Sequence, residues 1–182
     1  MVCKIKILTP NTPTFPLTGY GIGKLTAGLM TRQLSKQLKL EHVWVRILSV
    51  YGPCDWKNSL IMSTICKLGN HETPSLTKGE QVWDYLYSGD AAEALRLVAE
   101  KGISEKIYVL GSGSAMPLFE YINTIKELID PNAYLAYGDI PYAKDQIMYL
   151  RADISELTKD TGWVSNTVFR DGIKEILKAN NN

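Results

Sequence analysis

The stretch Tyr20-Gly21-Ile22-Gly23-Lys24 begins a long helical pattern, and the rest of the chain is organised around it. In a helix, residues four positions apart share one face and lie about one turn apart. The phenol of Tyr20 and the ammonium of Lys24 are therefore expected side by side. A cation beside a tyrosine favours the phenolate, which can take up a proton. The spacing predicts a tyrosine–lysine pair that moves a proton on a substrate.

Apolar residues recur from Tyr20 to Leu40 at close to the 3.6-residue period of a helix. They are Ile22, Leu25, Leu29, Met30, Leu34 and Leu38. Charged residues such as Arg32 and Lys36 occupy other faces. The period predicts a long amphipathic helix.

Buried strands alternate with helices along the chain. Residues 42–50 and 106–110 are almost continuously apolar and rich in β-branched side chains, which is typical of strands covered on both faces in a parallel sheet. Residues 79–87 mix aromatic and β-branched residues and predict a third strand. Asn58 and Asp90 are expected to cap the helices that follow them. This order predicts an α/β fold with a partial Rossmann-type parallel sheet and flanking helices.

Two glycine-rich stretches have the composition of phosphate loops. The run Gly19-x-Gly21-x-Gly23-Lys24 lacks the spacing of a Walker loop and follows no strand, so no phosphate site is expected there. Residues 111–114, Gly-Ser-Gly-Ser, follow a strand and precede a helix, so they could bind an anion at the helix N-terminus. A tight turn with a serine cap is the favoured alternative.

The size and charge of the chain limit its class. It has 182 residues, 45% of them hydrophobic and 21% charged, which suits one compact domain. We expect an irregular lead-in at 1–19, a single α/β domain at 20–178 and a frayed tail at 179–182. A formal net charge of +1 gives no bulk attraction to nucleic acid or a membrane surface. No apolar run approaches the roughly 20 residues of a membrane helix, and no signal-peptide pattern is found at Met1.

Cysteines and histidines do not form a site pattern. Cys3, Cys54 and Cys66 are odd in number and form no CxxC, which favours a reduced, cytoplasmic protein. His42 and His71 have no metal-ligand spacing with Cys, Asp or Glu, so no metal site is expected.

Several blocks together carry a family resemblance. They are YGIGK at 20–24, RILSVYGP at 46–53, GEQVWDYLY at 79–87, KIYVLGSG at 106–113 and TGW at 161–163. In this order they resemble the C-terminal half of the extended short-chain dehydrogenase/reductase family, in particular its sugar-nucleotide epimerases, dehydratases and ketoreductases. The match covers nearly the whole chain, and it implies a small C-terminal substrate-binding subdomain beside the sheet.

The resemblance implies roles for residues at matching positions. Tyr20 would be the general acid/base on a sugar hydroxyl or keto oxygen during hydride transfer with NAD or NADP. Lys24 would hold the nicotinamide ribose and favour the phenolate. Ser49, Val50 and Tyr51 would border the cofactor, although relatives commonly carry asparagine where this chain has Ser49.

On the substrate side, the resemblance points to Asn58, Gln81 and Trp83 as contacts of a nucleotide-sugar. Many relatives carry an arginine at the position of Trp83 that meets the diphosphate, whereas a subset with a Trp-Asp pair is similar to this chain. For Asn58 and Gln81, a helix cap and a surface polar residue are equally good explanations.

The family's N-terminal half has no counterpart in the 19 residues before Tyr20. That half carries the GxxGxxG loop, the residue that selects NAD or NADP, and the catalytic Ser or Thr; here only Thr9, Thr12 and Thr14 supply hydroxyls, in a proline-rich segment. We therefore expect the chain alone neither to bind NAD tightly nor to turn over. Three functions stay open: an enzyme completed by a Rossmann-bearing partner chain, a non-catalytic nucleotide-sugar-binding module, and a truncated remnant. The sheet edge and apolar surface left without that half predict a homo-oligomer or pairing with another chain.

Overall fold

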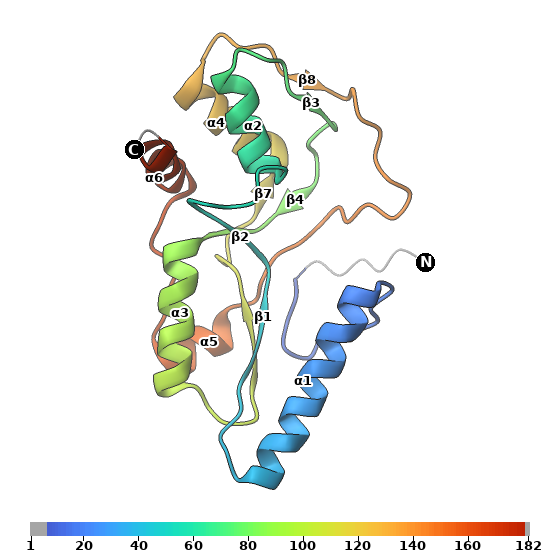
Figure 1. Ribbon diagram of the computed structural model, residues 1–182, viewed down its shortest axis with the longest axis vertical. Coiled ribbons are helices and arrows are strands. Elements are labelled where there is room, and N and C mark those ends of the chain that lie inside the picture. Colours follow the sequence, from blue (N-terminus) through green and yellow to red (C-terminus); the bar gives the residue numbers. More distant parts are fainter. Residues whose placement is uncertain (1–6, 181–182) are drawn as a thin grey trace.

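The computed structural model describes residues 7–180 and shows an α/β fold, as the sequence predicts (Figure 1). The helices are α1 (Gly19–Leu38), α2 (Leu60–Gly69), α3 (Ser88–Lys101), α4 (Leu118–Ile129), α5 (Ser155–Thr161) and α6 (Phe169–Asn180). The strands are β1 (Trp44–Ile47), β2 (Ser49–Tyr51), β3 (Ser75–Leu76), β4 (Val82–Trp83), β5 (Tyr85–Tyr87), β6 (Ile107–Leu110), β7 (Met116–Pro117) and β8 (Ala136–Tyr137). Residues 1–6 of the expected lead-in and residues 181–182 of the expected tail lie outside the described residues. Residues 179 and 180 are the last two of α6.

The strands pair in four short ladders. β1 pairs with β6, β2 with β5 and β3 with β8, all parallel, whereas β4 pairs antiparallel with β7. The strand predicted at 42–50 is therefore two strands, because the chain changes partner at Leu48, whose N–H still bonds the carbonyl of Leu110 at 2.9 Å. The strand predicted at 79–87 is also interrupted, at Asp84.

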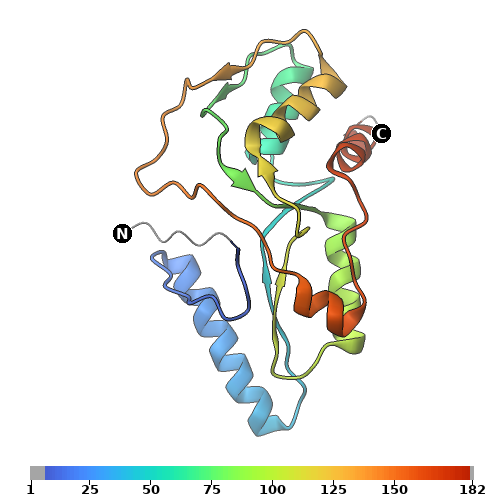
Figure 2. The same ribbon diagram turned by 180° about the vertical axis from the view of Figure 1, so that it is seen from behind.

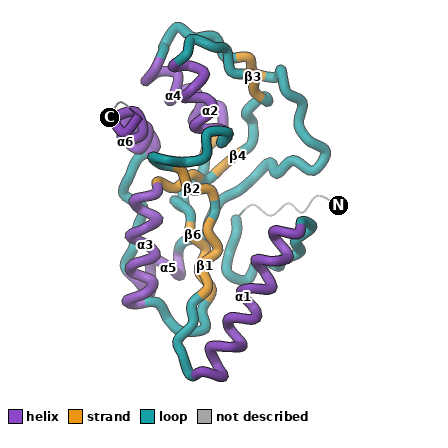
Figure 3. Tube along the Cα trace, viewed as in Figure 1, coloured by secondary structure: helices purple, strands orange, loops and turns teal. Residues whose placement is uncertain are grey.

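The buried apolar residues form two separate cores. Figures 2 and 3 show the elements around them, with α2, α4 and α6 towards one end of the molecule and α3 and α5 beside the β1–β6 ladder. The first is enclosed by α2, α4 and α6 and contains Tyr51, Ile61, Met62, Ile65, Leu68, Leu76, Ile122, Ile125, Leu135, Ile173 and Ile176. The second lies between α3, α5 and the β1–β6 ladder and contains Leu86, Ala91, Ala94, Val98, Tyr108, Leu110, Leu157 and Trp163. The chain passes from one core to the other around Tyr51, around Asp84 and around Trp163.

Helix α1 packs on a different face from the one that the apolar spacing predicts. Thr18 caps its N-terminus by accepting a hydrogen bond from the N–H of Gly21 at 3.1 Å. Five of the six apolar side chains of the predicted repeat stay exposed, and only Leu25 is half-buried: Ile22 is 52% exposed, Leu29 61%, Met30 67%, Leu34 52% and Leu38 58%. The helix instead meets β1 through Gly28, which lies against the indole of Trp44. The expected amphipathic helix exists, but its expected buried face is wrong.

Replacing Gly28 with leucine should lower the free energy of unfolding by about 1–3 kcal/mol, because overpacking strains a close contact. A Cβ atom at Gly28 would lie only 2.7 Å from the indole of Trp44. The matched control is Gly23→Leu on the same helix, where a Cβ atom meets nothing within 4 Å. Urea unfolding measures both variants, and equal stabilities would contradict this packing.

The caps expected at Asn58 and Asp90 lie elsewhere. Ser59 caps α2 by accepting a hydrogen bond from the N–H of Met62 at 3.3 Å. Asp90 lies inside the first turn of α3, and its carboxylate instead accepts hydrogen bonds from the segment at 165–167, at 2.8 to 3.1 Å. A carboxylate near a helix N-terminus is favourable whether or not it caps the helix. Here the carboxylate of Asp90 holds residues 165–167 against α3.

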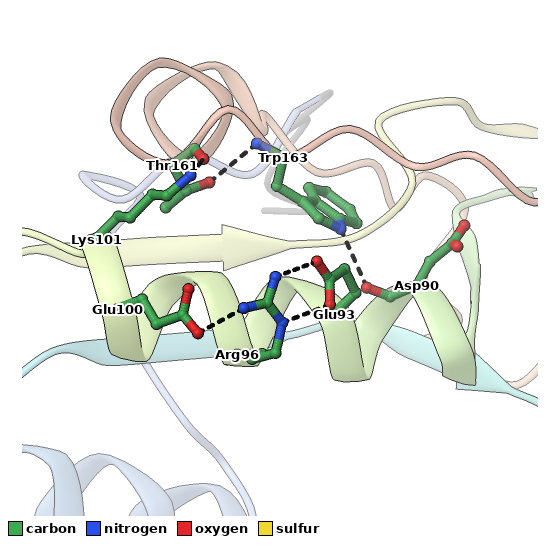
Figure 4. A network of polar contacts seen from close by, with 7 residues as sticks. All are labelled: Asp90, Glu93, Arg96, Glu100, Lys101, Thr161 and Trp163. Atoms are coloured by element: carbon green, nitrogen blue, oxygen red, sulfur yellow. Dashed lines mark hydrogen bonds and ion pairs between the residues drawn. The ribbon is translucent and has the colours of Figure 1, made fainter.

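Polar contacts also fasten the end of α5 to α3 (Figure 4). The indole N–H of Trp163 donates to the carbonyl of Asp90 at 3.1 Å, and Nζ of Lys101 donates to the carbonyl of Thr161 at 3.4 Å. On the outer face of α3, Arg96 pairs with carboxylates on both sides, at Glu93 and Glu100. These outer pairs are exposed and contribute little to stability.

The start of β6 is held to α5 by Lys106, which directly precedes the strand and lies between two carboxylates. Nζ of Lys106 lies 2.6 Å from Asp160 and 2.9 Å from Glu156, and the hydroxyl of Tyr108 donates to Asp160 at 2.7 Å. The hydrogen bond from Lys106 is the largest cause that lowers the pKa of Asp160, and that from Tyr108 comes second.

The contribution of Asp160 to the free energy of unfolding should be lost at low pH. Because the folded-state pKa lies below the unfolded value of about 3.9, the contribution is present above that value and disappears as the pH falls through the folded pKa. We expect Asp160→Asn to be less stable than the wild type at neutral pH and the difference to shrink below about pH 4. Thermal unfolding from pH 3 to pH 7 would measure it, with exposed Asp145→Asn as control; a difference that does not change with pH would contradict it.

Candidate functional site

The predicted pair lies at the start of α1. The ring of Tyr20 is 77% exposed, and Nζ of Lys24 lies 5.5 Å from the centre of that ring. The sequence prediction that Tyr20 and Lys24 share one face is confirmed by this contact. No hydrogen bond to the Tyr20 hydroxyl is formed by the residues that the structure describes, so its oxygen is available to an incoming group.

A groove of about 580 Å³ runs beside this pair, between the first turns of α1 and strand β1. Its walls are Tyr20, Gly21, Lys24 and Leu25 on one side, Trp44, Val45, Arg46 and Ile47 on the other, and Thr14, Phe15 and Pro16 at the end. The guanidinium of Arg46 donates to the carbonyls of Pro10 and Thr12 at 3.1 and 3.2 Å, which fixes the lead-in against the strand. A small molecule in the groove would contact both the phenol and the ammonium.

Two predicted residues from different segments are joined by a hydrogen bond. The indole N–H of Trp83 donates to the hydroxyl of Ser49 at 2.7 Å. The backbone carbonyl of Trp83 accepts from the hydroxyl of Tyr121 at 2.9 Å, and burial raises the pKa of Tyr121 to about 12, so this phenol stays a neutral donor. The structure thus brings a residue predicted for the cofactor and one predicted for the substrate into one polar cluster.

Other predicted residues are placed less favourably for direct contact. Tyr51 is 2% exposed and packs edge-on against Tyr85 and Tyr87, and burial raises the pKa of its hydroxyl. Its side chain therefore belongs to the core, and only its backbone is left for a ligand. Val50 is half-buried beside the second core.

The amides of Gln81 and Asn58 differ strongly in environment. Gln81 is 3% exposed, and its side chain bonds the hydroxyl of Thr77 at 3.3 Å, so it is not a surface polar residue. Asn58 is exposed, and its neighbour Ser59 takes the capping role.

Asp84 is the important residue that sequence reasoning missed. It is fully buried, and its carboxylate accepts hydrogen bonds from the N–H and hydroxyl of Ser112 at 2.7 Å each, from the N–H of Gly113 at 3.1 Å and from the N–H of Ala152 at 2.9 Å. Gly111 has to be glycine, since a Cβ atom there would lie 2.8 Å from the carboxylate. The available signal was a charged residue inside the apolar run at 82–87.

The same contacts settle the role of the Gly-Ser-Gly-Ser turn. Its N–H groups do point at an anion, but the anion is the chain's own Asp84. The turn leads into β7 before α4 begins, so the less favoured alternative, an anion site at a helix N-terminus, is not formed here. The favoured tight turn is present, but no serine side chain caps α4. The other glycine run lies in the first turns of α1, capped by Thr18.

A dinucleotide does not fit the described residues well. Among the described residues, one glycine-rich stretch is the first turns of α1 and the other donates its N–H groups to Asp84, so neither of these two stretches offers free N–H groups to a pyrophosphate. Within residues 7–180 no three His, Cys, Asp or Glu side chains gather as metal ligands. Nor does any helix in this range have the length and apolar content to cross a membrane.

The site therefore has two parts. Tyr20 and Lys24 stand on α1 beside the groove, and Ser49, Trp83 and Gln81 stand where the chain crosses between the two cores. Within the described residues, no hydrogen bond or ion pair joins the two parts. The first part presents an exposed phenol and an ammonium beside the groove, and the second contains polar groups that are held by hydrogen bonds.

Known proteins match this chain over most of its length. A family model described as the NAD dependent epimerase/dehydratase family matches residues 5–111, more than half of the chain. The dTDP-glucose 4,6-dehydratase of Salmonella typhimurium is 25% identical over 181 residues, covering 96% of this chain and 50% of the relative. The dTDP-4-dehydro-6-deoxyglucose reductase of Escherichia coli is 26% identical over 168 residues, covering 90% and 52%.

A solved structure has the same fold. The dTDP-glucose 4,6-dehydratase of Bacillus anthracis, determined in complex with NAD, superposes with a TM-score of 0.85 at 20% identity, covering 98% of this chain and 57% of that one. The chain spans about half the length of the curated relatives it matches. The prediction of a C-terminal portion of this family is confirmed.

Proposed function

Because this chain belongs to the NAD dependent epimerase/dehydratase family, we propose that it supplies the catalytic helix and the substrate-binding part of an NAD(P)-dependent enzyme that acts on a nucleotide-sugar. The observation that carries the proposal is the pair on α1, with Nζ of Lys24 5.5 Å from the ring of Tyr20 and a groove beside both. Relatives that are named for dTDP-linked sugars support the substrate class.

In this proposal the Tyr20 oxygen gives a proton to, or takes one from, a sugar hydroxyl or keto oxygen. The exposed phenol lets such an oxygen approach to the hydrogen-bonding distance of about 2.6–3.2 Å that proton transfer requires. The ammonium of Lys24 would stabilise the phenolate by its charge. Ser49, Trp83, Gln81 and Asn58 would serve as binding groups, and NAD or NADP would be held mainly by a segment that this chain does not contain.

The test is to measure binding and turnover separately. Calorimetry on the purified chain should show no NAD(P) binding at micromolar concentration. Fusing the chain behind the N-terminal half of the Salmonella typhimurium relative should restore NAD(P) binding and turnover of a nucleotide-sugar. Micromolar NAD(P) binding by the chain alone would contradict the proposal that another segment holds the cofactor. A fusion protein that binds NAD(P) but does not turn over would contradict the catalytic role of Tyr20 and Lys24.

A non-catalytic nucleotide-sugar-binding module is the second candidate. It is favoured by the cluster of Ser49, Trp83 and Tyr121, which is hydrogen-bonded without any contribution from α1. Binding of a nucleotide-sugar by the chain alone, combined with an inactive fusion, would establish this alternative.

We also propose that another chain covers α1, since five of its large apolar side chains, those of Ile22, Leu29, Met30, Leu34 and Leu38, are more than half exposed. Light scattering at micromolar concentration should then give a mass above the 20.4 kDa of one chain. Replacing Leu34 and Leu38 by glutamine should lower that mass. A stable monomer would contradict the association.

A further inference from the structure

We propose that Trp83 is a positioning residue, which acts on a bound ligand through the hydroxyl of Ser49 and does not touch the ligand itself. Ser49 is then the group that donates a hydrogen bond to an oxygen of the ligand. This inference deepens the proposed function and rests on it, because the ligand is taken to be a nucleotide-sugar.

The contact between the two side chains has a fixed direction. The indole N–H of Trp83 lies 2.7 Å from the hydroxyl oxygen of Ser49. An indole N–H can only donate, whereas a hydroxyl can both accept and donate. The oxygen of Ser49 is therefore the acceptor, and its single proton is left for another oxygen. Within residues 7–180, this O–H forms no hydrogen bond to a protein acceptor.

The backbone that carries the indole is held on both sides. Trp83 pairs with Met116 in the β4–β7 ladder, and its carbonyl accepts a hydrogen bond from the hydroxyl of Tyr121 at 2.9 Å. The next residue, Asp84, is fully buried and accepts four hydrogen bonds. A donor on so firmly held a backbone keeps its direction when a ligand arrives.

Ser49 lines a hollow of about 440 Å³ next to the groove of Tyr20 and Lys24. Thr14, Arg46 and Ile47 line both spaces, so the two adjoin and one extended ligand can lie across both. Trp83 is not among the described residues that line either space. The hydroxyl can therefore meet the ligand, while the indole stands behind it.

Contacts within this chain hold the lead-in as a wall of the hollow. The N–H of Leu8 donates to the carbonyl of Arg151 at 2.7 Å, and the carbonyl of Leu8 accepts from the N–H of Asp153 at 2.8 Å. The guanidinium of Arg46 donates to the carbonyl of Thr12 at 3.2 Å. In ligand pockets a few placed polar groups fix the orientation of the ligand, and the directed hydroxyl of Ser49 is such a group.

The contact in solution can be followed by the indole N–H signals of the ¹⁵N-labelled chain, which has four tryptophans. The signal of Trp83 is the one lost in Trp83→Phe. In Ser49→Ala this signal should move to the position of an indole without a protein acceptor. In Ser49→Thr, which keeps the hydroxyl, it should stay close to the wild-type position. An unchanged signal in Ser49→Ala would overturn the proposal.

The action through Ser49 is measured by titrating the same samples with dTDP-glucose. Ser49→Ala should weaken the affinity about 3–10-fold, the usual contribution of one hydrogen bond, and Ser49→Thr should keep it. Trp83→Phe should weaken it about 2–3-fold, yet cause no further loss in a chain that already carries Ser49→Ala. The control is Trp56→Phe, which removes an indole that is 69% exposed and should leave the affinity unchanged.

Losses that add up in the double variant would mean that Trp83 contacts the ligand itself, and they would overturn the proposal. A wild-type chain that does not respond to millimolar dTDP-glucose would overturn it as well. Turnover of the fusion protein is a separate measurement, so a failure here can be told from a failure of the catalytic role of Tyr20. If Trp83→Phe does not fold, excluding the signals of the other three tryptophans identifies the indole, and the two Ser49 variants decide.

Discussion

Replacing Asp84 with alanine should lower the free energy of unfolding by about 3–5 kcal/mol, because each buried donor left without an acceptor costs about 1–3 kcal/mol. The side chain is fully buried and accepts four hydrogen bonds, three of them from backbone N–H groups. Ser112 and Gly113 lie in the turn after β6, and Ala152 lies before α5. The loss would therefore separate segments that cross between the two cores.

Urea unfolding of Asp84→Ala measures this loss, and Asp139→Ala is the matched control. Asp139 is exposed, and its side chain forms no hydrogen bond or ion pair within the described residues, so its removal should change stability by less than about 0.5 kcal/mol. The loss of stability in Asp84→Asn should lie between those of the two alanine variants. An amide offers one acceptor oxygen and turns its NH₂ donor toward the other N–H groups.

The vacated pocket offers a second readout. In Asp84→Ala, the N–H groups of Ser112 and Gly113 would be left pointing at an empty anion position. Formate, a carboxylate of the right size, should therefore restore part of the lost stability, whereas chloride at equal ionic strength should not. A loss below about 1 kcal/mol, or equal effects of formate and chloride, would contradict the role of the carboxylate.

The class of fold and the order of its elements could be predicted because they depend on local signals. The apolar runs at 42–50 and 106–110 did become parallel partners, since a strand buried on both faces shows its character in composition alone. The pair Tyr20 and Lys24 could be placed on one face from helical spacing alone.

The predictions that failed concern features that depend on contacts between distant segments of the chain. The period of α1 indicated an apolar face, but the helix meets the indole of Trp44 through the small Gly28. Leu29, Leu34 and Leu38 are left exposed. The break at Leu48 arises because β1 and β2 find different partners, at β6 and β5. Neither partner is visible in the local sequence.

Carboxylates whose hydrogen-bond partners lie far along the chain were the other source of error. Asp90 was predicted as a helix cap because such caps are local. Its carboxylate instead accepts hydrogen bonds from residues 165–167, far along the chain. Asp84 was passed over because a single charge inside an apolar run has no local partner. Its partners come from the turn at 112–113 and from Ala152.

Replacing Tyr20 with phenylalanine should lower the turnover number of the completed enzyme by about 10²–10⁴-fold, the usual contribution of a positioned general acid or base. The completed enzyme is the chain fused to the N-terminal half of its Salmonella typhimurium relative. The expectation depends on the single oxygen that the substitution removes. In this structure that oxygen faces outward, beside Lys24 and the groove.

A matched control separates chemistry from folding. Tyr134 is 73% exposed, close to the 77% of Tyr20, so Tyr134→Phe removes a similar hydroxyl from a similar surface. Both variants should keep the wild-type stability to within about 0.5 kcal/mol, because neither hydroxyl is buried. Only Tyr20→Phe should lose turnover, and its affinity for the nucleotide-sugar should stay close to the wild-type value, since the ring that borders the groove is kept.

If both variants turn over alike, Tyr20 does not move the proton and the catalytic assignment fails. If both lose activity together, the loss comes from the exposed surface and not from the phenol beside Lys24.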